Sequence, residues 1–332
     1  MNEQEAAWLA RTQEEPIDPH QEICDPHHHL WDYPESRYML EELHGDTGAG
    51  HNVTSTVFVE CASGYREDGP EEMRVVGETE FVLEVAERSD GAGASIAGIV
   101  SHANMLLGDG AKAVLEAHIE AGGGRFRGIR HSAAYDPSPD IRVSHSKPPP
   151  SMLLRSDFRR GFACLGPLDL SFDAWLYHPQ IDELTDLAHT FPDTRIILDH
   201  VGGPLGIGPY RGRRREVEAN WRKSITELAR CENVVVKLGG LPMKICGFGW
   251  HKQDAPPSSA ETAEAHRPYY LHCIDRFGVD RCMFESNFPV DRAGGAYTLL
   301  WNSFQRIVSD FSEDEKAALF RDTARHIYRL DP

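Results

Sequence analysis

The sequence predicts an α/β protein with a (β/α)8 fold, the TIM barrel, on the basis of three observations. Short runs of β-branched and other apolar residues recur about eight times along the 332 residues. A stretch with apolar residues at helical spacing follows most of these runs. Several runs are apolar on both faces, as the buried parallel strands of such a barrel are.

The expected strands are taken in chain order from the apolar runs. They comprise residues 22–25, 55–62, 95–103, 126–133, 170–177, 194–202, 233–240 and 281–288. The amphipathic stretches between and after them comprise residues 71–88, 111–121, 180–191, 215–231, 260–278 and 312–330. The last of these begins with a capping box formed by Ser312 and Glu315. A doubly wound open sheet is the alternative fold, but no G-x-G-x-x-G motif follows the first strand.

The chain is expected to form a single barrel domain over residues 23–332, preceded by an N-terminal extension at residues 1–22. This extension is polar and acidic, which does not fit a signal peptide. Long loops follow several expected strands, at residues 136–150, 202–215 and 241–259. In a barrel such loops lie on the C-terminal face, where active sites are built.

Composition excludes some classes of partner. The net charge of −18 argues against nucleic-acid binding, which needs a basic face. No apolar run approaches the roughly 18 residues of a membrane span. The seven cysteines are widely spread and include no C-x-x-C pair, so a disulfide framework or a structural zinc site is not expected. A reducing cytoplasm is the simplest compartment for such a chain.

The stretch CDPHHHLWDYP, which begins at Cys24, contains three consecutive histidines at the end of the first expected strand. In an extended chain His27 and His29 point the same way, and His28 points oppositely. An H-x-H pair at a strand end can present two imidazoles to one metal ion or to one substrate oxygen. Taken alone the pair is weak evidence, because a histidine-rich loop would look the same.

Other expected strands also end in ionisable or polar residues, which would converge if the barrel closes. A capping or solvated loop residue explains any one of them, but explains the whole set less well. These strand-end residues are Glu60, Arg130, His131, His178, Asp199, His200, Lys237, Glu285, Asn287 and Asp291.

Six motifs in a fixed order resemble the amidohydrolase-2 family of the amidohydrolase superfamily. They are DPHHHLWD, FVECA, GIRH, LDHVGGP, VVVKLGGL and MFESNFPVD, and the resemblance extends from about Ile23 to Leu330. Relatives include lactonases acting on pyrone dicarboxylate, sulfomuconolactone and sugar lactones, together with decarboxylases. The resemblance implies a TIM barrel, in agreement with the pattern of strands and helices.

The resemblance also implies roles for individual residues. His27 and His29 match the H-x-H pair of the first strand, and His200 matches a histidine of the sixth. These three are the expected ligands of one divalent ion, with Zn²⁺ as the best candidate, although a metal-free mechanism stays open. Strand four supplies Arg130 where two-metal relatives carry a lysine, so a two-metal site is not expected.

The chain departs from the family in strand eight, where Asn287 stands in place of the usual aspartate. An amide cannot accept a proton as a carboxylate does, and it is a weak metal ligand. The general base is therefore expected to be Glu285, with Asp291 as the next candidate. His200 or His29 is the alternative base, because an imidazole titrates near neutrality.

The sequence thus predicts a hydrolase that opens a lactone-type ring in a small anionic molecule by activated-water attack. A metal-dependent decarboxylase on the same barrel is one alternative. A ligand-binding protein or degenerate enzyme that lost its base with Asn287 is another. Homo-oligomerisation stays open, because buried helix faces do not distinguish core from subunit contacts. The expected substrate-binding residues are Glu60, Arg130, His131, His178 and Lys237.

Overall fold

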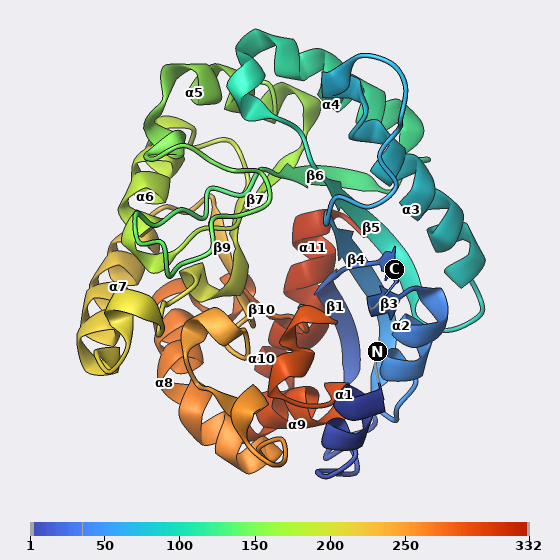
Figure 1. Cartoon of the computed structure of the whole chain (residues 1–332), viewed down its shortest axis with the longest axis vertical. Coiled ribbons are helices and arrows are strands. Elements are labelled where there is room, and N and C mark those ends of the chain that lie inside the picture. The colour runs from blue at the N-terminus through green and yellow to red at the C-terminus, as the bar shows by residue number, and fades with distance from the viewer. Residues whose placement is uncertain (1–2, 35, 331–332) are drawn as a thin grey trace.

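The computed structural model describes residues 3–34 and 36–330 and contains one sheet of eight parallel strands (Figure 1). Each strand pairs with the next in chain order, so the predicted (β/α)8 architecture is confirmed. The strands are β1 Glu22–His28, β4 Asn52–Val59, β5 Ser95–Ser101, β6 Phe126–Arg130, β7 Ser171–Ala174, β8 Ile196–Leu198, β9 Val234–Leu238 and β10 Cys282–Phe284.

The barrel closes between its last and first strands just beyond the end of β10. The Asn287 amide donates to the His27 carbonyl at 2.9 Å, and the His29 amide donates to the Phe288 carbonyl at 2.9 Å. These bonds bring the histidine run of β1 against the residues that follow β10. Closure therefore places the two motifs side by side although they lie at opposite ends of the chain.

Helices surround the barrel and alternate with the strands, as the sequence predicts (Figure 1). The main helices are α3 Val76–Ser89, α4 Ala111–Ala121, α5 Ser156–Phe162, α6 Ile181–Thr190, α7 Arg214–Leu228, α8 Ser259–Phe277 and α9 Tyr297–Ile307. The hairpin of β2 Trp31–Tyr33 and β3 Ser36–Tyr38 and the helix α2 Leu40–Thr47 were not predicted, and α5 and α9 also lie outside the expected helical stretches. No helix in the described ranges is both long and apolar enough to cross a membrane.

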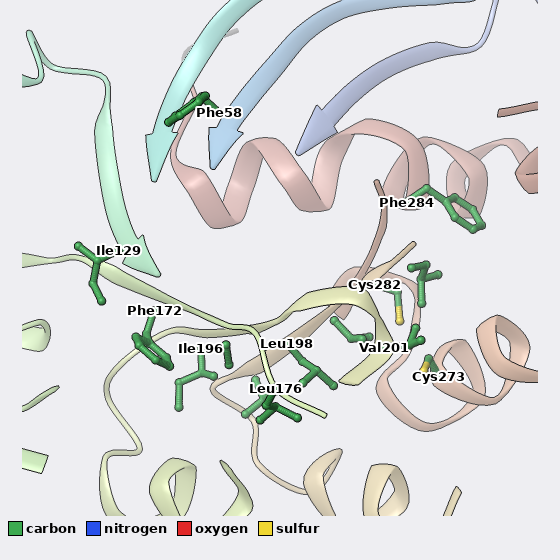
Figure 2. Close-up of a cluster of buried hydrophobic side chains, with 14 of the residues drawn as sticks. Phe58, Ile129, Phe172, Leu176, Ile196, Leu198, Val201, Cys273, Cys282 and Phe284 are labelled. Atoms are coloured by element: carbon green, nitrogen blue, oxygen red, sulfur yellow. The ribbon is translucent and has the colours of Figure 1, made fainter. Parts of the chain in front are cut away.

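Alternation along the strands divides the core into two parts. Outward-facing residues such as Phe172, Ile196 and Leu198 pack against the helices, and Figure 2 shows part of this cluster together with Cys273 of α8. Their inward-facing neighbours, including Ile197, form a second apolar cluster inside the barrel. Because successive side chains of a strand point to opposite faces, both clusters come from the same strands.

The C-terminal helix α11 Thr323–Tyr328 covers one end of the barrel (Figure 1). Its Ala324, Ile327 and Tyr328 side chains pack against the inward-facing apolar residues of the strands. The Tyr328 hydroxyl reaches further in and donates to Asp173 of β7 at 2.6 Å. This end of the barrel is therefore filled, which leaves the opposite end for a site.

The N-terminal segment contacts the loop after β9 and the helix α9. It begins with α1 Glu3–Leu9, from which the Trp8 indole donates to the Gln253 carbonyl at 2.9 Å. The Ile17 amide donates to the Asn302 side chain of α9 at 2.9 Å. The first residue of β1 is Glu22, and the division into an extension and a barrel domain stays a prediction.

An aromatic cluster between β10 and α9 offers a test of the outer core. Phe304 is fully buried, and its ring stacks on Phe284 with centroids 4.5 Å apart. Phe304→Ala should lower the free energy of unfolding by about 3–5 kcal/mol, because it removes buried contacts and leaves a cavity. Ile119→Ala, at a residue 42% exposed, is the control and should cost less than about 0.5 kcal/mol. Equal losses in urea titrations of the two variants would contradict this packing.

Candidate active site

A cavity of about 720 Å³ opens at the C-terminal end of the barrel. Histidine, cationic and aromatic side chains from the ends of the strands and from the following loops line it, which is where barrel active sites are found. The lining, called here the mouth cavity, includes His29, Trp31, Tyr33, Cys61, Arg130, Arg142, His145, Trp175, Tyr177, His200, Lys244 and Asn287.

A buried ammonium lies below the mouth cavity. Lys237 of β9 donates to Asp173 at 2.6 Å, and its Nζ is 3.1 Å from Asp199 Oδ1 and 3.2 Å from His27 Nδ1. Burial alone would lower the pKa of Lys237, but Asp173 and Asp199 raise it above its usual value. Lys237 is therefore a charged group that holds the floor together.

Arg130 connects this floor to the mouth cavity. Its guanidinium donates to the Glu60 carboxylate at 2.8 Å and to the Glu60 carbonyl at 2.6 Å. The Nη1 atom lies 3.5 Å from Asp199 Oδ2 and 3.3 Å from His27 Nε2. Burial would raise the pKa of Glu60, yet the charge of Arg130 holds it well below its usual range. Arg130 is thus a fixed cation at the edge of the cavity.

The imidazole of His200 is held in one orientation by Glu285. Both the amide and Nδ1 of His200 donate to Glu285 Oε1, at 3.1 and 2.7 Å. His200 has φ 55°, a left-handed conformation, and a Cβ added to Gly240 would lie 2.3 Å from the His200 Cβ. Because Nδ1 carries the proton donated to Glu285, Nε2 of His200 is left as an acceptor. His200 itself lines the mouth cavity.

Glu285 is placed behind the imidazoles rather than in the cavity. It is fully buried, and its second oxygen lies 2.8 Å from His27 Nδ1. Burial would raise the pKa of Glu285, but His200 and His27 lower it, so the carboxylate is ionised. Which residue acts as the general base stays a prediction; the contacts of Glu285 suit a group that orients His200.

Asn287 lines the mouth cavity, while Asp291 lies buried behind it. The side-chain amide of Asn287 donates to Asp291 Oδ1 at 2.8 Å, and Asp291 Oδ2 accepts from the backbone amide of Gly240 at 2.9 Å. Burial, followed by the charge of Glu285, raises the pKa of Asp291 above its usual range. Glu285 and Asn287 do not continue a regular strand, because β10 ends at Phe284 and Asn287 has φ 52°.

The histidine run divides as the strand period predicts. His29 lines the cavity, and its Nδ1 donates to the Val59 carbonyl at 2.8 Å. His27 is fully buried just beneath, with its ring 4.5 Å from that of His200. His28 points away, bonded to Thr56 at 3.0 Å.

Four of the five expected substrate-binding residues do not line the mouth cavity, and Arg130 is the exception. Glu60 is buried behind Arg130, and Lys237 lies in the floor. His131 follows inward-facing Arg130 and so turns outward, where Nδ1 accepts from the Met105 amide at 3.2 Å. His178 accepts from the Leu205 amide at 3.3 Å. Their role in binding substrate stays a prediction, and any such role would have to be exerted from outside the lining of the cavity.

One compact group of metal-ligating atoms is present among the described residues. Ligand atoms of His27, Asp199 and His200 lie within 4.8 Å of one another, whereas His29 is outside this group. Asp199 Oδ1 lies 3.1 Å from the Lys237 ammonium and Glu285 Oε2 lies 2.8 Å from His27 Nδ1, so an added cation would share these oxygens with groups already present. Two imidazoles and a carboxylate are a donor set that suits Zn²⁺. The predicted ligand set of His27, His29 and His200 shares two members with this group, and which residues bind a metal stays a prediction.

Sequence reasoning missed several residues of this region. Asp199 was named among the converging strand-end residues but given no role, and Asp173 was not named, although its place on β7 between outward-facing Phe172 and Ala174 signals an inward direction. Arg142 and Lys244 lie in loops, for which no periodicity indicates direction. Trp175 lies within the expected strand 170–177, two positions after Asp173, but was not singled out. Asp199 is held ionised: burial would raise its pKa, but Lys237 and His27 lower it well below its usual range.

A parallel barrel with ionisable groups gathered at its C-terminal end defines the class of TIM-barrel enzymes. The chain belongs to the amidohydrolase family, whose model matches residues 24–330. It is 32% identical over 331 residues to the protein y4mH of Sinorhizobium fredii, covering 93% of this chain and 98% of that one. It is also 28% identical over 255 residues to an L-fucono-1,5-lactonase of Burkholderia multivorans, covering 76% and 77%.

Solved structures share the fold. An amidohydrolase of Burkholderia multivorans with bound Zn has a TM-score of 0.71 at 24% identity, covering 93% of this chain and 99% of that one. A 2-pyrone-4,6-dicarboxylic acid hydrolase of Pseudomonas putida has a TM-score of 0.62 at 16% identity, covering 94% and 99%. Family membership and the lactonase relatives support a hydrolase at the level of the family.

The buried carboxyl group of Glu78, beside the site, has an unusually high pKa. Glu78 of α3 accepts from the amides of Cys61 and Ser63 at 2.9 and 2.8 Å, which fixes the loop after β4. Burial, followed by the charge of Glu60, raises the pKa of Glu78 to about 8. Between its usual pKa and this value the folded protein binds a proton that the unfolded chain releases, so stability falls as pH rises.

Glu78→Gln should abolish this dependence, because an amide keeps an acceptor oxygen and does not ionise. Relative to wild type, the variant should gain stability between pH 5 and 8, with a slope of at most about 1.4 kcal/mol per pH unit. Guanidinium titrations across this range measure the difference. Glu72→Gln, at an exposed residue near α3, is the control. A pH-independent difference for Glu78→Gln would contradict a raised pKa at this carboxyl.

Proposed function

We propose that this protein hydrolyses a lactone ring in a small anionic molecule. The observation that carries the proposal is that His200, oriented by Glu285, lines the same cavity as Arg130 and Asn287. A base, a fixed cation and an amide around one cavity are the groups that acyl transfer to water requires. The lactonase relatives support the same reaction class.

In the proposed reaction, water attacks the lactone carbonyl carbon and the ring C–O bond breaks, which gives a hydroxy acid. His200 Nε2 accepts the proton of the attacking water, and Glu285 stabilises the resulting imidazolium through Nδ1. The Arg130 guanidinium and the Asn287 side-chain amide, which line the same cavity, would donate to the developing oxyanion. The same imidazolium then returns its proton to the leaving alkoxide.

A divalent metal ion is a further part of the proposal, with Zn²⁺ as the candidate. His27, Asp199 and His200 would hold it. When bound, such an ion polarises a carbonyl and lowers the pKa of water. His200 Nε2 cannot ligate a metal and accept a proton at once, so these are alternative roles. Metal content and activity after chelation distinguish them.

Anionic character in the substrate is supported by the charges around the cavity. Besides Arg130, the exposed side chains of Arg142 and Lys244 line it. Neither forms an ion pair with a carboxylate among residues 3–34 and 36–330. A substrate carboxylate is the natural partner for such free cations. Trp31 and Trp175 would provide apolar faces for the ring.

Glu285→Gln should lower kcat by about 10–100-fold, because the partner that orients an acting histidine has that typical effect. KM should change little, since Glu285 does not line the cavity. Acid release from a panel of lactones in a pH-stat measures both constants. Glu22→Gln is the control, because this carboxyl pairs with Arg321 and Arg325 and contacts no residue of the proposed reaction. A wild-type kcat for Glu285→Gln would exclude the dyad, and CO₂ release would indicate a decarboxylase.

Metal analysis distinguishes the two candidate ligand sets. Asp199→Asn should reduce bound zinc at least tenfold relative to wild type, because it removes a charged ligand. His29→Asn should retain zinc, because His29 is outside the compact group. Zinc is measured after incubation and desalting, with circular dichroism to confirm folding. The opposite pattern would restore the His27–His29–His200 set, and full activity after exhaustive chelation would reject a metal mechanism.

A further inference from the structure

A second cavity of about 870 Å³ adjoins the mouth cavity between the loops that follow β8 and β9. It is called here the basic groove, because positively charged side chains dominate its polar lining. The groove is lined by Asp140, Gly206, Ile207, Gly208, Arg211, Lys244, Gly247, Gly249, His251 and Lys252. No role in the proposed reaction accounts for it.

The cations of the basic groove lack carboxylate partners. Arg211, Lys244 and Lys252 form no ion pair within the described part of the chain, and all three are exposed. Arg213, which lies immediately outside the groove, differs from these three cations because it forms an ion pair with Glu216. The chain as a whole has a net charge of −18, so the unpaired positive charges at this cavity are opposite in sign to the net charge of the protein. Such a concentration creates a local potential that attracts anions.

The shape of the groove is fixed by backbone contacts between its two loops. The Gly206 amide donates to the Ile245 carbonyl at 2.8 Å, and a Cβ on Gly206 would lie 2.2 Å from the Cys246 carbonyl oxygen. Arg214 reinforces the contact, because its guanidinium donates to the Cys246 carbonyl at 3.1 Å and stacks on Phe248. The glycines therefore allow a close approach that no larger residue permits. A cavity built this way does not need a ligand to form.

Lys244 lines both the basic groove and the mouth cavity, so the two are neighbours on one surface. We infer that the basic groove binds an anionic group, a phosphate or carboxylate, carried by the substrate whose lactone ring occupies the mouth cavity. This inference rests on the proposed function. Arg211 provides planar paired donors and Lys252 a point charge, which together suit a phosphate or carboxylate. The substrate is then a lactone with a charged substituent several bonds from the ring carbonyl.

The test compares a neutral aldonolactone with its terminal phosphate ester, using wild type and Arg211→Ala/Lys252→Ala. For the phosphorylated lactone the double variant should raise KM by about tenfold or more, with the neutral lactone unchanged. Arg215→Ala/Lys223→Ala, at exposed residues of α7, removes the same charge and should leave both KM values unchanged. An unchanged KM for the phosphorylated lactone in Arg211→Ala/Lys252→Ala, or an equal rise for both lactones, would overturn the inference.

Inorganic phosphate serves as a direct probe by calorimetry. Wild type should bind it, the groove variant should not, and phosphate should inhibit hydrolysis of the charged lactone competitively. Phosphate binding that leaves KM for the charged lactone unaltered would mean that the groove holds a separate anion, which overturns the inference. If no lactone is hydrolysed, the proposed function fails. Loss of phosphate binding in the groove variant would then still support an anion site, and equal binding would refute it.

Discussion

A charged lysine inside the barrel is the constraint on which the rest of the site depends. The ammonium of Lys237 is fully buried, so it must be neutralised by carboxylates within bonding distance, and Asp173 and Asp199 meet this need. Those carboxylates are in turn fixed by Tyr328 and Arg130. Removing one member would leave a buried charge without its partner, a change that typically costs 3–5 kcal/mol. The network thus positions His27 and Arg130 before any ligand arrives.

The barrel interior is built in two levels that follow from strand alternation. On β8, β9 and β10 the inward residues Ile197, Val235 and Met283 pack against α11. Two positions further along each chain segment stand Asp199, Lys237 and Glu285, which form the ionisable level. The apolar level excludes water from below, so the charges above it interact in a medium of low polarity. On each of these three neighbouring chain segments, the apolar core residue and the ionisable residue are therefore two positions apart.

Periodicity explains what could be predicted from the sequence and what could not. All eight strands and the gathering of ionisable groups at their ends were predictable, because apolar runs and a period of two are local properties. Direction beyond a strand end was not, since His200 and Asn287 adopt left-handed conformations that break the strand period. The hairpin after β1 and the cavity-lining loop residue Lys244 carry no periodic signal. The family's strand-eight pattern drew attention to Asn287 and Glu285. That Glu285 is hydrogen-bonded to His200 could be learned only from the structure.

Closure of the barrel through His27 and Asn287 has a consequence for how the protein is made. A ribosome must synthesise most of the chain before the first strand can meet its final neighbour, so the pairing has high contact order and a large loop-closure entropy. Until then β1 and the latest strand present free edges, which are templates for pairing with other chains. Forms of the chain that end before residue 287 would therefore keep β1 as an unpaired edge, open to pairing with other chains.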